Sequence, residues 1–157
     1  MKREHHYSIQ MKWTGNQGEG TKSYTSYSRD HEISKNKCEA IAGSSDSAFR
    51  GDPLRYNPEE LFLSTLSSCH MLMYLHFCAV NKIVVEEYTD YPDGIMQENE
   101  DGSGKFTEVV LKPLIVVKDA ETIDQAIYLH HEAHKSCFIA NSVNFNVKVK
   151  PEIVVLK

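Results

Sequence analysis

Residues 57–69, NPEELFLSTLSSC, decide the fold because they combine a strong helix start with a long apolar continuation. Asn57 caps the helix, Pro58 suits the first helical position, and the two glutamates that follow favour the positive end of the helix dipole. Apolar side chains then recur on nearly every side of the helix. Because a helix that is apolar all round is buried on most sides, we predict a buried central helix over residues 57–81. A chain of this length leaves part of such a helix exposed, so a second subunit could complete its burial.

Shorter elements flank this helix on both sides. Alternating or β-branched stretches predict strands, and helical spacing predicts a second helix over residues 121–136. The predicted strands are 6–13, 23–27, 31–34, 83–88, 106–117 and 144–149, with 151–156 as an extension of the last one. Residues 43–56 are typical of a loop, and Pro113 indicates an edge strand or a bulge. This order predicts a single α+β domain over residues 1–157.

The composition of the 157 residues is that of an ordinary globular protein, with 41% hydrophobic and 25% charged residues and a formal net charge of −5. The sequence contains no basic stripe, so we do not expect nucleic acid as a partner. The first residues carry no apolar leader. Small polar residues interrupt the apolar stretch 61–80, which argues against a membrane span. We therefore expect a soluble, cytoplasmic protein.

Four cysteines are present, without C-x-x-C or zinc-finger spacing. Cys78 follows Cys69 by nine residues, roughly half a turn out of phase on one helix, so the two sulfurs cannot pair there. Cys78 is expected in the core, and Cys38, in a polar segment, at the surface. Cys69 follows small residues in the middle of the first helix, and Cys137 follows the second helix.

The stretch 57–69 resembles the signature of the OsmC/Ohr family of hydroperoxide reductases. In that signature Asn-Pro-Glu opens a central helix, and a reactive cysteine comes ten residues after the glutamate. Cys137, followed by FIANSV, matches the place of the second family cysteine. The resemblance implies an OsmC-like α+β fold, with antiparallel sheets packed around a long buried central helix and a second helix. It also implies an intertwined homodimer.

The resemblance further implies a thiol-dependent peroxidase that reduces organic hydroperoxides to alcohols in oxidative-stress defence. Cys69 would be the peroxidatic thiolate and Cys137 the resolving thiol, with a dithiol as reductant and no cofactor. Glu59 would hold an arginine that polarises Cys69; Arg50 is the first choice and Arg55 the alternative. The best-known branches commonly carry an aromatic residue directly after the reactive cysteine, where this chain has a histidine. That departure leaves the preferred peroxide open.

The spacing of Glu59 and Cys69 has a geometric consequence. Ten residues of straight helix span about 15 Å, so the two side chains cannot touch within one helix. Either a long arginine side chain bridges much of the gap, or Glu59 of one subunit serves Cys69 of another. We therefore expect a homodimer with its sites near the subunit interface.

Three other functions compete with the peroxidase. His130, His131 and His134 on the second helix could bind a metal, since the first and last of them share a face. The apolar central helix could line a pocket for a small or lipid-like ligand in a non-enzymatic module. A Cys–His hydrolase is disfavoured, because adjacent Cys69 and His70 side chains diverge by about 100° on a helix.

Overall fold

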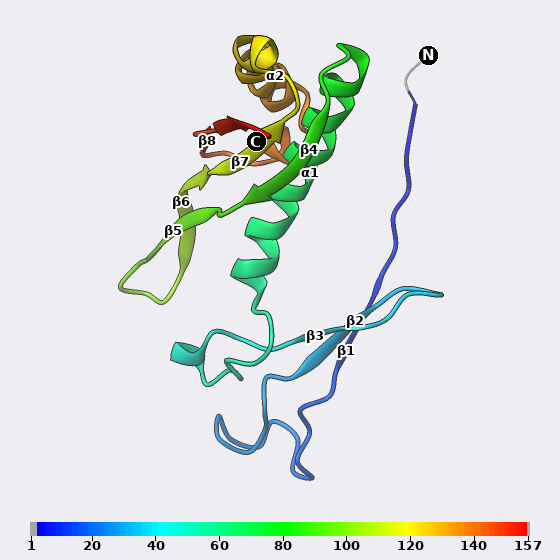
Figure 1. The fold of residues 1–157 in the computed structure, drawn as a ribbon. Helices are drawn as coiled ribbons and strands as arrows, with labels where there is room; N and C mark the ends of the chain where they lie inside the picture. The colour runs from blue at the N-terminus through cyan, green and yellow to red at the C-terminus, as the bar shows by residue number, and fades with distance from the viewer. Residues whose placement is uncertain (1–2, 157) are drawn as a thin grey trace. The chain divides into compact units, whose positions relative to one another are not determined.

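The computed structural model describes residues 3–156, which form two long helices and nine short strands (Figure 1). Contacts divide the chain into two compact units, Met1–Leu61 and Phe62–Lys157, each with its own sheets. The α+β class predicted from the order of elements is confirmed, although two of the three sheets are mixed rather than purely antiparallel.

The first unit holds a three-stranded antiparallel sheet of order β1-β2-β3. Its strands are β1 (Gln10–Trp13), β2 (His31–Ser34) and β3 (Ile41–Gly43). The sequence predicted β2 with its observed bounds, gave β1 four residues too many, and missed β3. The register pairs Trp13 with His31 and Met11 with Ile33.

The strand predicted at residues 23–27 is wrong, because that segment forms turns. The Ser26 hydroxyl donates to the carbonyls of Gly20 and Ser23 and accepts from the Ser23 backbone N–H. Arg29 lies over the rings of Tyr24 and Tyr27. Such local side-chain bonds offer the backbone an alternative to a sheet ladder, and they explain why the β-prone residues do not form a strand.

The segment before the first long helix is a tightly folded loop. A single 3₁₀ turn, η1 (Ser47–Phe49), is capped by Asp46 and ends at Arg50, whose φ of 66° lies in the left-handed region. Gly51 has to be glycine, since a Cβ there would lie 1.5 Å from the carbonyl oxygen of Ser45. The predicted loop is therefore a well-defined structure with only short regular pieces.

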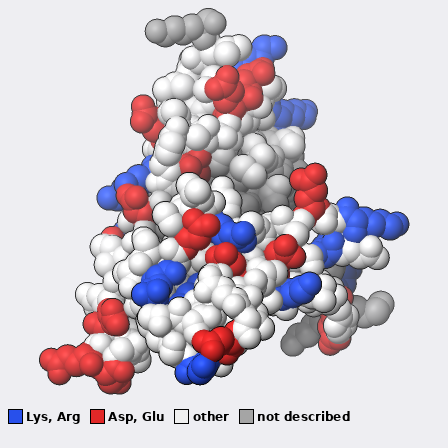
Figure 2. All heavy atoms as spheres, turned by 90° about the horizontal axis from the view of Figure 1, so that it is seen from below, with Lys and Arg blue, Asp and Glu red and all other residues white. Residues whose placement is uncertain are grey.

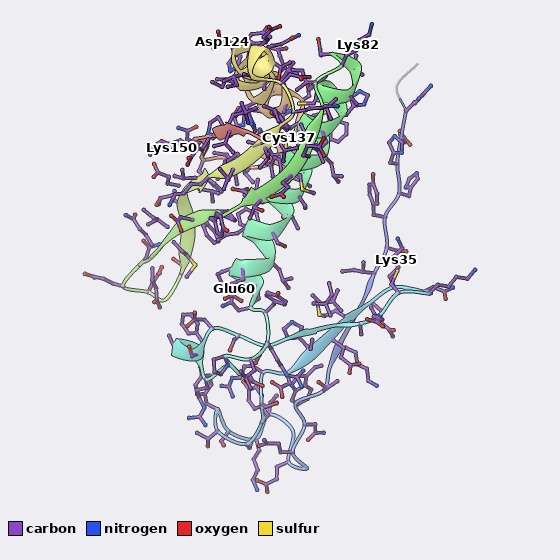
Figure 3. The ribbon with its side chains drawn as sticks, in the orientation of Figure 1. Lys35, Glu60, Lys82, Asp124, Cys137 and Lys150 are labelled. Carbon is purple, nitrogen blue, oxygen red and sulfur yellow. The ribbon has the colours of Figure 1, made fainter. Side chains whose placement is uncertain are left out.

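Helix α1 (Pro58–Val80) confirms the predicted start. The Asn57 side chain accepts from the Glu60 backbone N–H at 2.8 Å, and the Glu60 carboxylate accepts from the Asn57 N–H at 3.0 Å. This reciprocal pair is a capping box, which satisfies two otherwise unpaired donors. Glu60 lies in the first turn of the helix (Figure 3).

Only one stripe of α1 is buried in the chain, at a four-residue spacing: Leu66, His70, Tyr74 and Cys78. A single chain thus buries this helix only in part, as expected if a second subunit covers other sides of it. By length and composition alone α1 is apolar enough to cross a membrane, as core helices also are, and 22% of its most apolar window is buried. An apolar face of α1 is therefore left uncovered within the described chain.

The second unit carries two three-stranded sheets, β4-β7-β9 and β5-β6-β8. The strands are β4 (Val85–Asp90), β5 (Asp93–Glu98), β6 (Gly104–Leu111), β7 (Pro113–Val117), β8 (Asn146–Val149) and β9 (Glu152–Val155). In each sheet one antiparallel pair is joined by one parallel strand, β9 beside β7 and β8 beside β6.

Two strand predictions for this unit are corrected by the sheets. Residues 106–117 form two strands, because the chain leaves one sheet at Lys112, whose N–H donates to Asp90, and enters the other. Pro113 begins β7, the central strand of its sheet, where the first position tolerates a missing N–H. Residues 152–155 likewise join a different sheet from β8 and do not extend it.

Helix α2 (Ile123–Ser136) follows a 3₁₀ turn, η2 (Ala120–Thr122), and precedes another, η3 (Ala140–Ser142). Its buried residues Ala126, Leu129 and Ala133 share a core cluster with Tyr74 and Cys78 of α1. A second cluster gathers around Leu66, Val109, Leu111 and Val147. Each fully buried large aliphatic side chain contributes about 1.5–3 kcal/mol, so these clusters hold α1 and α2 within the second unit.

Candidate active site

Two sulfurs from distant parts of the sequence meet in the second unit. Cys69 lies in the middle of α1, and Cys137 is the residue at which α2 ends. Their Sγ atoms are 2.9 Å apart, with the Cys137 thiol donating to the Cys69 sulfur. Figure 3 labels Cys137 where the chain leaves α2. The structure therefore brings together the two cysteines that the sequence singled out, both of them as free thiols.

Local backbone geometry fixes the place of Cys137. The residue leaves the helix in an extended conformation, φ −71° and ψ 111°, so its side chain departs from the helical path. The Ala140 N–H donates to its sulfur at 3.5 Å, and the Asn141 N–H donates to its carbonyl at 3.0 Å. The turn of η3 thus folds back over Cys137 and holds the sulfur in place.

The two thiols differ in their surroundings. Cys137 is 1% exposed, whereas Cys69 is half-buried. Burial, together with the hydrogen bond to Cys69, raises the pKa of Cys137 to about 11. At neutral pH Cys137 therefore keeps its proton and donates it toward Cys69. An approaching molecule reaches Cys69 first.

Cys69 opens into a cavity of about 630 Å³ within the second unit. Its lining is mostly apolar and comes from two segments, α1 and the turn after α2: Thr65, Ser68, Cys69, Leu72, Met73, His76, Phe138 and Ile139. A cavity of this size suits a small organic molecule. The arrangement thus pairs an accessible sulfur with an apolar recess and a second sulfur behind it.

The other predicted site residues belong to the first unit. Because the capping box occupies Glu60, the neighbouring Glu59 is the glutamate left over for another role. Arg55 lies 3.5 Å from a carboxylate oxygen of Asp52 and 3.9 Å from one of Asp30. Arg50 is exposed, and no ion pair holds it among residues 3–156.

The remaining cysteines lie where the sequence placed them. Cys78 is 1% exposed and packs in the core cluster with Tyr74. Burial raises the pKa of its thiol, which keeps it protonated and unreactive. Cys38 is exposed.

A buried histidine pair was missed as a unit by the sequence reasoning. His70 Nε2 and His130 Nδ1 are 3.0 Å apart, and His70 therefore bonds to His130 rather than to Cys69. The available signal was the four-residue stripe of α1, on which His70 falls between Leu66 and Tyr74. In the described part of the chain, no three His, Cys, Asp or Glu side chains are arranged to hold a metal ion.

The chain is similar to known proteins in sequence and in fold. The model of the OsmC-like protein family matches residues 51–152. An OsmC-like protein of unknown function from Vibrio cholerae is 36% identical, with 96% of this chain and 100% of that chain covered and a TM-score of 0.80. No curated protein matches the sequence.

More distant solved structures share the fold. An OsmC-like protein from Mycoplasma pneumoniae is 16% identical, covers 97% of this chain and 99% of its own, and has a TM-score of 0.73. An organic hydroperoxide resistance protein from Elizabethkingia anophelis is 23% identical, covers 98% of this chain and 100% of its own, and has a TM-score of 0.67. The arrangement of helices and sheets is therefore common to all three.

Proposed function

The chain belongs to the OsmC-like protein family, and from this premise we propose that it is a cysteine-based hydroperoxide reductase acting in defence against oxidative stress. The observation that carries the proposal is the 2.9 Å approach of Cys69 and Cys137, which lie 68 residues apart in the sequence. Cys69, one of these two free cysteines, also lines an apolar cavity that an organic substrate could enter. Hydroperoxide resistance proteins among the structures of the same fold support this role.

The proposed reaction has two steps on the protein. The Cys69 thiolate attacks the outer oxygen of R–O–O–H; the O–O bond breaks, the alkoxide takes a proton and leaves as alcohol, and Cys69 becomes a sulfenic acid. The Cys137 sulfur then attacks the Cys69 sulfur, a disulfide forms, and the hydroxyl leaves as water with the Cys137 proton. A dithiol reductant returns both cysteines to thiols and is itself oxidised to a disulfide.

The roles of the two sulfurs follow from their surroundings. A peroxidatic cysteine has to be reached by substrate, and Cys69 lines the cavity. A resolving cysteine has to stay unreactive toward peroxide, and Cys137 is buried with its pKa raised to about 11. The apolar cavity favours organic hydroperoxides over hydrogen peroxide, because a small polar peroxide gains little from apolar walls.

Arg50 is the arginine that we propose to polarise Cys69, with Glu59 as its acidic partner. A guanidinium close to a thiol favours the thiolate, and a carboxylate can hold the guanidinium through a bidentate pair. Arg55 is the weaker candidate, since Asp30 and Asp52 already hold it. In a homodimer, Glu59 could serve Cys69 of its own subunit or Cys69 of the partner subunit.

A homodimer is part of the proposal. Leu72 and Val80 of α1 are each 64% exposed and Phe138 is 75% exposed. Large apolar side chains exposed to this extent are typical of interaction sites when they lie on one face, and Leu72 and Phe138 line the same cavity. A second copy of the chain is the partner that the incomplete burial of α1 calls for. A cytoplasmic location and the absence of nucleic-acid and membrane partners stay predictions; Figure 2 shows basic and acidic side chains interspersed over the face in view.

A non-enzymatic module that holds a small or lipid-like ligand is the second candidate, because the cavity alone would serve it. The two functions separate in a steady-state assay with an organic hydroperoxide and a dithiol, on wild type, Cys69→Ser and Cys137→Ser. We expect Cys69→Ser to abolish turnover. Cys137→Ser should consume a single equivalent of peroxide and stop at a sulfenic acid. Peroxide consumption by Cys69→Ser at the wild-type rate would exclude the peroxidase.

A further inference from the structure

A pair of buried imidazoles lies on the two helices that carry the active-site sulfurs. His70 of α1 is 1% exposed and His130 of α2 is 3% exposed, and their Nε2 and Nδ1 atoms are 3.0 Å apart. Burial lowers the pKa of His70 to about 4, with a contribution from nearby His134, and that of His130 to about 3. Both rings are therefore neutral at neutral pH, and one N–H donates to the lone pair of the other.

The pair is close in sequence to both sulfurs. His70 directly follows Cys69 on α1. His130 precedes Cys137 by seven residues, which is about two turns of α2. A hydrogen bond between the two rings consequently joins the helix of one sulfur to the helix of the other.

Other contacts between α1 and α2 are of a different kind. The Tyr74 ring stacks on His130 at 3.8 Å between centroids, and apolar side chains around it complete the core. Apolar packing has no directional preference. The exposed hydrogen bond from Gln125 to Asn81, at 3.2 Å, joins the far end of α1 to the start of α2. The thiol of Cys137, which directly follows α2, also donates to Cys69, but that bond is only partly buried and is the contact to be positioned. Among the described residues, the histidine pair is the fully buried side-chain hydrogen bond between α1 and α2.

The histidine pair lowers the stability of the core, because two of its ring nitrogens are left unpaired. His70 Nδ1 and His130 Nε2 are buried without a hydrogen-bond partner in the described part of the chain. A buried polar atom without a partner costs about 1–3 kcal/mol, whereas two apolar rings of similar shape would cost little. A hydrogen bond that adds this little to stability can still serve another role, because a buried polar pair can specify one arrangement of the helices that it joins.

We propose that the His70–His130 hydrogen bond positions Cys137 against Cys69 for the resolution step, an inference that rests on the proposed function. The disulfide forms only when the two sulfurs move from 2.9 Å to about 2.05 Å. A small slide of α2 along α1 would separate them, and the directional bond between the rings resists that slide. The histidines act by holding the sulfurs of Cys69 and Cys137 close together, and they do not react themselves.

The test separates the two chemical steps in a single turnover. Reduced protein is mixed with one equivalent of cumene hydroperoxide; a sulfenic-acid trap reports the first step, and loss of paired thiols reports the second. The double variant His70→Phe/His130→Phe removes the hydrogen bond and keeps both aromatic rings. We expect disulfide formation to slow by about 10-fold or more, the scale expected for misplaced reacting atoms, with sulfenic-acid formation within about two-fold of wild type.

Three further variants sharpen the outcome. His130→Asn keeps an amide group near the position of Nδ1 that can either accept from or donate to His70, and it should restore most of the disulfide rate. Gln125→Ala breaks the exposed bond between the same two helices and should leave both steps unchanged. If the double variant does not fold, as circular dichroism would show, His130→Phe alone breaks the bond and keeps a ring against Tyr74.

Two outcomes overturn the proposal: wild-type disulfide formation in the phenylalanine variants, or slow formation in Gln125→Ala to the same extent. Failure of the proposed function is a different result. In that case the wild-type protein itself yields no sulfenic acid and loses no paired thiols.

Discussion

At the scale of single residues, the two arginines before α1 are distinguished by their backbone and their partners. Arg50 has a φ of 66°, a conformation that disfavours residues other than glycine, and it lacks an ion pair in residues 3–156. Arg55 is held by two carboxylates. An outlying backbone conformation is a reason to look for function, and this one presents the guanidinium to solvent.

Arg50→Gly tests this assignment cleanly. Glycine adopts positive φ without strain, so the free energy of unfolding should stay unchanged or rise by up to about 1 kcal/mol. If Arg50 polarises Cys69, kcat/KM for an organic hydroperoxide should fall by about 100-fold. Lys37→Gly, at a φ of 65°, is the matched control and should keep full activity. Full activity of Arg50→Gly would move the role to Arg55.

The buried histidines predict acid sensitivity. Their pKa values, about 4 for His70 and about 3 for His130, lie below 6.5, so as pH falls below 6.5 the unfolded chain takes up protons before the folded one. Stability is therefore fully present above that pH and falls by up to about 1.4 kcal/mol per pH unit for each histidine below it. Urea unfolding at about pH 7 and about pH 5 should show a steeper loss in wild type than in His70→Phe/His130→Phe. Equal slopes would mean that the pair titrates normally.

Sequence reasoning at this scale singled out the two cysteines that the structure brings together, and it missed the histidine contact. Cys69 stands at a fixed distance from a helix start, and Cys137 directly follows a helix, so both carry local marks. The partner of His70 is 60 residues away. Nothing near either histidine in the sequence encodes that they meet, because the contact is made by the packing of α1 against α2.

At the scale of elements, the start of α1 was predictable because its signals are local. Asn57 and Glu60 satisfy each other within one turn. Strand β5 was missed since Asp93 and Gly94, typical turn residues, open it. β9 was mistaken for an extension of β8, because sequence alternation does not tell which sheet a strand joins.

Asn57→Ala measures the contribution of the capping box. The Glu60 N–H loses its acceptor, so the free energy of unfolding should fall by about 1 kcal/mol. Denaturant titration followed by far-ultraviolet circular dichroism would detect this. Glu60→Gln retains an acceptor for the Asn57 N–H and should lose less. No loss in Asn57→Ala, with a clear loss in Glu60→Gln, would argue that the charge of Glu60 at the helix dipole, rather than the box, stabilises this end.

At the scale of the whole molecule, the uncovered face of α1 predicts self-association. Leu72→Glu places a charge on that face and should shift the protein from dimer to monomer in sedimentation velocity, because an unpaired buried charge is strongly unfavourable. Leu156→Glu changes another exposed leucine, 52% exposed, and should leave the dimer intact. A monomeric wild type would remove the dimer from the proposal. The sequence pointed to a second subunit through the apolar circumference of the helix, but a single chain does not specify its position.

The meeting of Cys69 and Cys137 also has a consequence for the denatured chain. A bond between them would close a covalent ring spanning 68 residues, from the middle of α1 to the end of α2. In the loop-entropy description such a ring lowers the conformational entropy of the unfolded chain and raises the free energy of unfolding by about 4 kcal/mol. The oxidised protein should therefore melt at a higher temperature and resist proteolysis longer than the reduced one. In each catalytic cycle the protein would then alternate between a cross-linked and an open chain. Its melting temperature would report whether Cys69 and Cys137 are oxidised or reduced.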